Sequence, residues 1–121
     1  HPAYHIGAAS RGPLEHDELA VTGGLLGEAV ELVPCKTVDL MVPAYAEVVI
    51  EGRIHQDSFE MDGPFAEYAG YYGAPMKVPV IDVSAITHRK DPIWHDLFPS
   101  FREHTQVGVL GREAQLFRRL R

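Results

Sequence analysis

Apolar and polar residues alternate most regularly between residues 46 and 54. Every second position is apolar, which is the period of a β-strand with one face buried. We therefore predict a strand here, with its apolar face toward the interior of the protein. The inward-facing residues are Ala46, Val48, Ile50 and Ile54, and the outward-facing residues are Glu47, Glu51 and Arg53.

Further strands are predicted on both sides of this segment. Residues 78–87 have apolar side chains at both odd and even positions, and so on both faces of the strand, which is typical of a central strand covered on both faces. Residues 29–33 form a short strand that a proline breaks, and residues 38–41 form another. Residues 42–44 form an edge or a bend, because proline cannot donate to a ladder. Residues 93 and 94 start one more short strand.

Three segments are predicted to be helical. Asp17 is a good N-cap for a helix over residues 18–26, with a glycine after its last residue. Residues 2–10 form either a short helix with proline in its first turn or a strand, and we favour the helix. Residues 10–13 form a loop. Between residues 102 and 120, apolar side chains recur at helical spacing. These side chains are Val107, Leu110, Ala114 and Phe117.

Together these segments predict a single α+β domain, with a mainly antiparallel sheet and flanking helices. A length of 121 residues is enough for one domain with a core. The net charge of −6 argues against a nucleic-acid-binding protein, and no apolar run approaches the ~20 residues of a membrane span. The single cysteine, Cys35, allows no internal disulfide, which fits a reducing compartment such as the cytoplasm. The chain does not begin with Met, and we expect it to be part of a longer protein.

Residues 59–73 are rich in groups that can carry chemistry. They combine a Gly-Pro turn and several aromatic residues with two acids, Asp62 and Glu67. If alternation continues after the turn, Glu67 shares a face with Phe65 and Tyr71. A carboxyl group in apolar surroundings has a raised pKa and can hold a proton near neutral pH, so Glu67 is a candidate general acid. The alternative is an ordinary hairpin with exposed acids.

Glu18 also permits two interpretations. On the predicted helix it shares a face with Val21 and Leu25, so it is a carboxylate on a largely apolar face and a candidate ligand. The simpler interpretation is that the helix dipole stabilises an acid in the first turn, by about 0.3–1 kcal/mol. The chain has no standard phosphate loop, zinc spacing or nucleophile elbow. The candidate residues are therefore the carboxylates Glu18, Asp62 and Glu67.

Four motifs occur in a recognisable order. Residues 17–19 read DEL and are followed by two glycines, residues 42–52 read VPAYAEVVIEG, residues 62–71 read DGPFAEYAGY, and residues 86–93 read ITHRKDPI. The last three resemble VPA…AEIVLEG, EGPFGE(F/Y)xGY and ITHR…DPI of the UbiD-like family of decarboxylases, and the first resembles the helix that precedes them in that family. The resemblance covers nearly the whole chain. It implies the second half of the family's central cofactor-binding domain, with a split β-barrel-like, flavin-reductase-like fold.

The resemblance also implies a cofactor and a reaction. UbiD-like enzymes use prenylated FMN with a divalent metal, commonly Mn²⁺, and often K⁺. They reversibly decarboxylate aromatic and α,β-unsaturated carboxylic acids. By position in the motifs, Glu67 matches the acid that delivers the proton replacing CO₂, Asp62 matches an acid that pairs with an arginine, and Glu18 matches a metal ligand. The segment whose backbone approaches the cofactor and K⁺ is matched by Ala8, Ala9 and Ser10.

Two positions depart from the family pattern. The family usually has glutamate where this chain has Asp62, and glycine where it has Ala66. The family's arginine partner and the other metal ligands match no residue of this chain. We therefore expect the 121 residues alone to be inactive and to require the remainder of a parent chain or a partner subunit, in a homo-oligomer. The alternative is a truncated paralogue or small subunit that acts as a scaffold for a partner chain.

Overall fold

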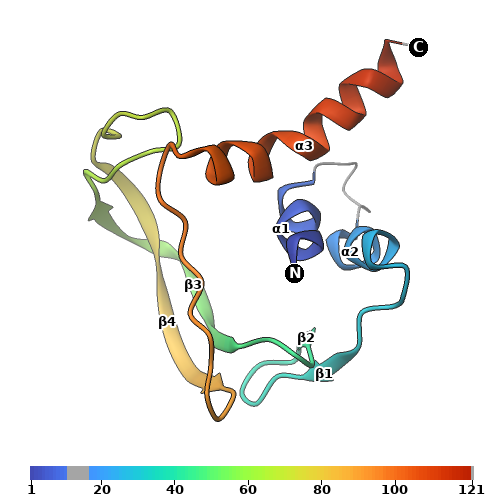
Figure 1. The fold of residues 1–121 in the computed structure, drawn as a ribbon. Coiled ribbons are helices and arrows are strands. Elements are labelled where there is room, and N and C mark those ends of the chain that lie inside the picture. The colour runs from blue at the N-terminus through green and yellow to red at the C-terminus, as the bar shows by residue number, and fades with distance from the viewer. Residues whose placement is uncertain (11–16, 121) are drawn as a thin grey trace. The chain divides into compact units, whose positions relative to one another are not determined.

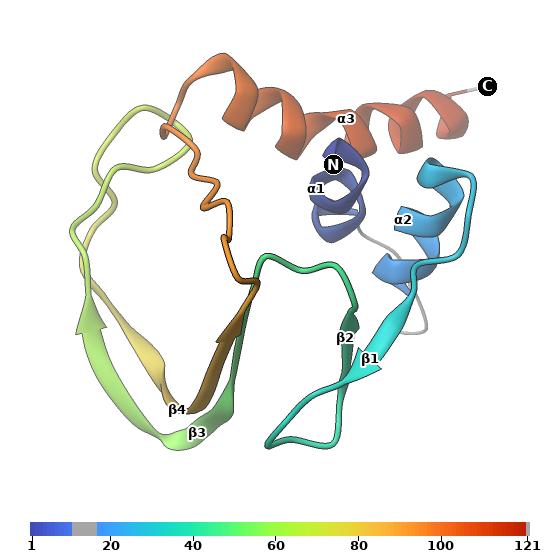
Figure 2. The ribbon, with the colours of Figure 1, turned by 60° about the horizontal axis from the view of Figure 1, so that its bottom comes forward.

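The computed structural model describes residues 1–10 and 17–120 (Figures 1 and 2). Most of the loop predicted at residues 10–13 lies outside the described residues. In chain order, the elements are α1 (Pro2–Ala9), α2 (Glu18–Leu26), β1 (Leu32–Pro34), β2 (Met41–Pro43), β3 (Val48–Asp62), β4 (Met76–His88) and α3 (Arg102–Arg119). The predicted α+β fold with antiparallel sheets and flanking helices is confirmed.

The chain divides into two compact units, which we describe separately. The helical unit comprises His1–Val30, Tyr68–Gly70 and Leu97–Arg121, and the strand unit comprises Glu31–Glu67 and Tyr71–Asp96. None of the helices within the described residues is both long and apolar enough to cross a membrane.

In the helical unit, α1 contacts both α2 and α3 (Figure 1). The bounds predicted for α2 are confirmed: Asp17 Oδ1 accepts hydrogen bonds from the backbone N–H groups of Leu19 and Ala20, at 2.9 and 3.2 Å. The helix ends at Gly27, whose φ of 80° is favourable only for glycine. The buried Gly7 of α1 lies against Thr22 of α2, and a Cβ atom at Gly7 would overlap the Thr22 hydroxyl. A glycine here therefore lets the two helices approach closely.

In the strand unit, β1 and β2 form a two-stranded antiparallel ribbon, with Leu32 opposite Pro43 and Pro34 opposite Met41. The strands predicted at residues 29–33 and 38–41 are therefore displaced toward the prolines. A strand with one neighbour can carry proline at its end without losing a ladder hydrogen bond, so the two prolines did not exclude strands. The strand predicted at residues 93 and 94 is absent from the described residues.

The second sheet is a long antiparallel hairpin of β3 and β4. β3 continues to Asp62, well beyond the predicted end at Ile54. Within the described residues β4 pairs only with β3, so the prediction of a central strand is wrong for this chain. The ladder has two irregularities, one of which leaves Ser84 without a partner between the pairs Glu51–Ala85 and Gly52–Val83.

One face of this hairpin is apolar and open. Ile50 pairs with Ile86, and Ile54 pairs with Ile81, and directly paired residues lie on the same face of a ladder. We call this surface the isoleucine face, and its members are more than half exposed: Ile50, Ile54, Ile81, Val83 and Ile86. The predicted orientation of this strand is therefore wrong, because the isoleucines are exposed whereas Glu51 is only 4% exposed. The side chains that cover the hairpin lie on the Glu51 face.

We predict that the isoleucine face makes the chain self-associate. Covering one isoleucine side chain is worth about 1.5–3 kcal/mol, so Ile54→Lys should weaken the association by roughly tenfold or more. Sedimentation velocity over a range of concentrations measures this. Asp57→Lys is the control, since it adds a lysine to the same strand without removing an apolar side chain. A wild-type chain that sediments as a monomer at all concentrations would contradict the prediction.

Candidate functional site

Glu67 lies in the connection between β3 and β4, which we call the hairpin loop (residues 63–75). The backbone N–H of Glu67 donates to the Tyr71 carbonyl at 2.9 Å, and the N–H of Gly73 donates to the Phe65 carbonyl at 3.0 Å. The chain enters the loop through Gly63, which has a φ of 85° and a cis peptide bond to Pro64. The loop is thus closed on itself by backbone hydrogen bonds, which fix the peptide that carries the Glu67 side chain.

Of the two interpretations of residues 59–73, the structure agrees with the ordinary hairpin whose acids are exposed. Residues 65–72 form a turn with one isolated bridge instead of a strand, so alternation does not continue past the Gly-Pro turn. Phe65 and Tyr71 are 51% and 78% exposed, and Glu67 is exposed as well. Gly73 leaves room for the acid, because a Cβ atom at Gly73 would lie 3.2 Å from Glu67 Cγ. The Glu67 side chain is therefore open to solvent.

Asp62 is the last residue of β3 and is also exposed. Its Oδ1 accepts a hydrogen bond from the N–H of Gly63, at 2.9 Å. The short aspartate side chain reaches the next backbone amide in this way, so the aspartate found in place of the family's glutamate caps the entry to the hairpin loop. The ion pairs formed by the described residues involve neither Asp62 nor Glu67. The arginine that the resemblance assigns to Asp62 is therefore not supplied by this part of the chain.

The other predicted site residues lie in the helical unit. Glu18 begins α2 with an exposed side chain, and its carboxylate is a hard oxygen ligand of the kind that Mn²⁺ accepts. No group of three histidine, cysteine or acidic side chains suitable for a metal occurs among the described residues. Any metal bound by Glu18 would therefore need its other ligands from outside the described residues. At the end of α1, Ser10 Oγ donates to the Gly7 carbonyl at 2.6 Å. The small side chains there that leave the backbone approachable are Ala8, Ala9 and Ser10.

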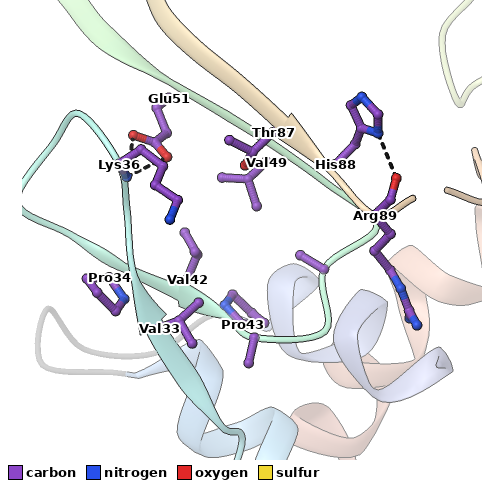
Figure 3. Close-up of a pocket in the computed structure, with 12 residues that line it drawn as sticks. Val33, Pro34, Lys36, Val42, Pro43, Val49, Glu51, Thr87, His88 and Arg89 are labelled. Atoms are coloured by element: carbon purple, nitrogen blue, oxygen red, sulfur yellow. Dashed lines mark hydrogen bonds between the residues drawn. The ribbon is translucent and has the colours of Figure 1, made fainter. Parts of the chain in front are cut away.

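A cavity of about 370 Å³ lies in the strand unit, between the β1–β2 ribbon and the hairpin (Figure 3). Its walls are mainly apolar, with Val33 and Val42 from the ribbon facing Val49 of β3. Lys36 and Arg89 add positive charge at its edge. None of the predicted site residues lines this cavity, so it is separate from the carboxylates discussed above.

Glu51 lines this cavity and is buried. The alternation pattern predicted instead that it faces outward. Its carboxylate accepts hydrogen bonds from the backbone N–H of Lys36, at 2.8 and 2.9 Å (Figure 3). It also accepts one from the backbone N–H of Thr37, at 2.6 Å. The Thr37 hydroxyl adds a further bond, at 2.7 Å. The Lys36 bond is the main reason that the pKa of Glu51 is lowered, although burial acts in the opposite direction. Glu51 therefore holds the turn between β1 and β2 against the hairpin.

We predict that Glu51→Gln destabilises the chain most at neutral pH. Because the folded pKa is lowered, the stabilisation is complete above the usual pKa of glutamate and is lost as the pH falls through the folded value. The difference in melting temperature between wild type and variant should therefore be largest near pH 7 and shrink below pH ~4. Thermal melts followed by circular dichroism at several pH values measure this. A difference that is independent of pH would contradict the role of the charge.

Cys35 precedes this turn and is the single cysteine of the chain. Burial, and secondly the negative charge of Glu51, raise the pKa of its thiol. A raised pKa keeps the thiol protonated, and the thiolate is the reactive form. Cysteine-based nucleophilic chemistry is therefore disfavoured at this position.

Comparisons with known proteins agree on one family. The sequence model described as "UbiD: 3-octaprenyl-4-hydroxybenzoate carboxy-lyase Rift-related domain" matches residues 1–101. An uncharacterized protein of Archaeoglobus fulgidus is 38% identical over 94 residues, which are 78% of this chain and 20% of that protein.

Solved structures are similar over almost all of the chain. The UbiD-class enzyme HmfF from Pelotomaculum thermopropionicum, in complex with FMN, has a TM-score of 0.94 and 45% identity over 98% of this chain and 26% of its own. An evolved dimeric form of HmfF, in complex with prFMN, has the same TM-score and identity, and the match covers 28% of its chain. The apo 3,4-dihydroxybenzoic acid decarboxylase AroY of Klebsiella pneumoniae has a TM-score of 0.83 and 34% identity over 93% of this chain and 25% of its own. The chain thus spans about a quarter of the length of these enzymes.

Proposed function

Because the chain belongs to the UbiD family, we propose that it forms part of a carboxy-lyase that removes CO₂, without net oxidation, from an aromatic or α,β-unsaturated carboxylic acid. The observation that carries this proposal is the match to HmfF, with 45% identity and a TM-score of 0.94 over 98% of the chain. AroY, another of these neighbours, is a 3,4-dihydroxybenzoic acid decarboxylase. The retained acid Glu67 supports the same chemistry.

We further propose that the chain is the second half of the central cofactor-binding domain of a longer protein. The isoleucine face supports this, because five apolar side chains that are each more than half exposed need a covering layer. A two-stranded hairpin is also marginally stable by itself. The remainder of the parent chain, or a partner subunit in a homo-oligomer, would supply that layer.

In this proposal one acid of the chain, Glu67, donates the proton, and another, Glu18, is a metal ligand. Glu67 transfers its carboxyl proton to the carbon that has lost CO₂. Because Glu67 is exposed in this chain, the apolar surroundings that favour a protonated carboxyl group would come from the rest of the protein. Asp62 fixes the entry to the hairpin loop and, in the whole protein, pairs with an arginine from outside this chain. Glu18 would provide one ligand to Mn²⁺, and the segment of Ala8, Ala9 and Ser10 would hold the cofactor and K⁺. Prenylated FMN, when bound, would accept the electron pair left on the substrate carbon as CO₂ departs.

Reconstitution tests both the proposed function and the proposal that this chain is only half of the cofactor-binding domain. We expect the 121-residue chain, mixed with prenylated FMN, Mn²⁺ and K⁺, to release no CO₂ from a panel that includes 3,4-dihydroxybenzoate and cinnamate. The longer protein that contains the chain should bind the flavin, seen in its absorbance spectrum, and release CO₂ from at least one acid. Activity of the isolated chain would overturn the proposal that the chain is only half of the domain. A longer protein that binds flavin and releases no CO₂ from any acid would instead support the scaffold alternative.

A further inference from the structure

The cavity between the β1–β2 ribbon and the hairpin is built entirely from residues of the strand unit. On the hairpin side, Val49 of β3 pairs directly with Thr87 of β4, so both side chains lie on the Glu51 face of the ladder. On the ribbon side, Val33 and Val42 face them (Figure 3). The hydrogen bonds of Glu51 to the turn between β1 and β2 hold the two walls together. The cavity is therefore a defined feature of this unit.

The size and the walls of the cavity suit a small molecule. Its volume of about 370 Å³ lies within the range of small-molecule sites, roughly 300–1,000 Å³. Such sites have mainly apolar walls and a few polar groups that orient the ligand. Pro34 and Pro43 add to the apolar surface of the three valines. The walls therefore favour a ligand with an apolar body.

Two polar groups of the walls have no partner within the described part of the chain. The Lys36 ammonium extends from the turn into the space between the walls, and the ion pairs of the described residues do not include it (Figure 3). The hydroxyl of the half-buried Thr87 makes no hydrogen bond with a described residue. By contrast, Arg89 pairs with Glu47, at 3.3 Å, and the Glu51 carboxylate already accepts hydrogen bonds from the turn. The groups left for a ligand are therefore donors, one of them charged, which suits an anionic acceptor.

We propose that this cavity binds a small carboxylate with an apolar body, whose charged end lies beside Lys36 and the Thr87 hydroxyl and whose body lies between the two walls. Aromatic acids and short fatty acids share this chemistry. Neither Glu67 nor Glu18 lines the cavity, so the proposal does not rest on the proposed function. The Lys36 side chain is exposed, so its charge adds a modest part of the affinity and the apolar walls supply the rest.

Titration of the ¹⁵N-labelled chain with 2-naphthoate, followed by two-dimensional NMR, tests the site. The amides of Lys36, Val49 and Thr87 should shift until saturation, with a Kd of about 1 mM for a ligand of this size. The matched alcohol, 2-naphthalenemethanol, lacks the charge and should bind about two- to fivefold more weakly. Octanoate is titrated in parallel, and the tighter of the two acids shows whether a flat or a flexible body fits better. Shifts confined to the isoleucine face, or equal affinities for acid and alcohol, would overturn the proposal.

Two variants test the polar contacts. Lys36→Gln removes the charge and keeps the backbone N–H that bonds Glu51, so it should weaken the binding of 2-naphthoate about two- to fivefold and leave that of the alcohol unchanged. Thr87→Val keeps the shape of the side chain and should also weaken the binding of the acid. Lys77→Gln is the control, since Lys77 is exposed on β4 and does not line the cavity. Full affinity for the acid in Lys36→Gln or Thr87→Val would overturn the contacts on which the proposal rests.

Hydrogen–deuterium exchange of the longer protein shows whether the remainder of its chain leaves the cavity open. At a concentration near its Kd, 2-naphthoate should slow the exchange of peptides from residues 33–46, because a bound ligand opposes local opening. The effect should be smaller in Lys36→Gln and unchanged in Lys77→Gln. Slower exchange around Glu67 without any effect on residues 33–46 would show that the acid binds only at the proposed active site. That result would overturn the proposal.

Discussion

Replacing Glu67 by glutamine is expected to lower kcat for decarboxylation by about 10²–10⁴-fold in the longer protein, with little change in KM. Glutamine has the same shape and cannot deliver a proton, so the loss falls on the proton transfer to carbon. Asp62→Asn keeps the size and the oxygen that accepts from Gly63, and should cost less. Stopped assays of CO₂ release give kcat and KM, and incorporation of deuterium into the product in D₂O follows the proton transfer directly.

A matched control separates this effect from a general loss of acidic charge. Glu60 lies on β3, before the hairpin loop, and is exposed. Glu60→Gln removes the same charge by the same chemical change and should leave kcat within about twofold of wild type, as is usual for surface substitutions. Equal losses for the two glutamine variants, or a Glu67→Gln protein that retains full kcat, would contradict the assignment of Glu67 as the proton donor.

Gly52→Ala should lower the free energy of unfolding by about 1–3 kcal/mol, which is the usual cost of overpacking. A Cβ atom at Gly52 would overlap the carbonyl oxygen of Asp82 on β4, and this backbone atom cannot rotate away as a side chain could. The position lies beside the irregularity at Ser84, where the two strands approach closely. Urea unfolding of wild type and variant, followed by circular dichroism, measures the difference.

Gly24→Ala is the control for this experiment. Gly24 lies within α2, and a Cβ atom there would meet no atom within 4 Å. Alanine should therefore stabilise the helix by roughly 0.5–1 kcal/mol, because glycine is a poor helix former. The same chemical change is thus expected to have opposite signs at the two positions. A Gly52→Ala variant as stable as wild type would show that the two strands have room to separate.

The helices were predictable from the sequence because their ends are encoded locally. The side chain of Asp17 bonds the first amides of α2, and Gly27 takes the left-handed conformation that ends it. Both effects act within a few residues, so a single sequence contains them. The helix over residues 102–120 was found from its apolar spacing and ends one residue earlier, at Arg119.

The orientation of β3 was not predictable in the same way. Alternation correctly grouped Ile50 with Ile54 and placed Glu51 on the opposite face. It cannot say which face is covered, because the covering residues come from elsewhere in the sequence. The turn at Lys36 and Thr37 covers the Glu51 face in this chain and satisfies the carboxylate. The turn at Lys36 and Thr37 has backbone N–H groups that are available to a carboxylate, and these groups let Glu51 be buried.

The residues of the candidate site were found by motif and not by pattern. Alternation offered a buried Glu67 as one of two interpretations, but residues 65–72 form a turn instead of a strand and the acid is exposed. Glu18 looks like an ordinary first-turn acid, and its proposed role depends on ligands that the described residues do not contain.

The antiparallel hairpin also has a consequence for the order in which the strand unit folds. Asp62 pairs with Met76 next to the hairpin loop, whereas Val48 pairs with His88 at the open end. Pairs near the loop close the shortest stretch of chain and so lose the least entropy, and each later pair adds to an existing ladder. Substitutions in the loop should therefore alter mainly the folding rate, and substitutions near Val48 mainly the unfolding rate. The hairpin loop, which carries the proposed proton donor, is thus also where the pairing of β3 with β4 begins.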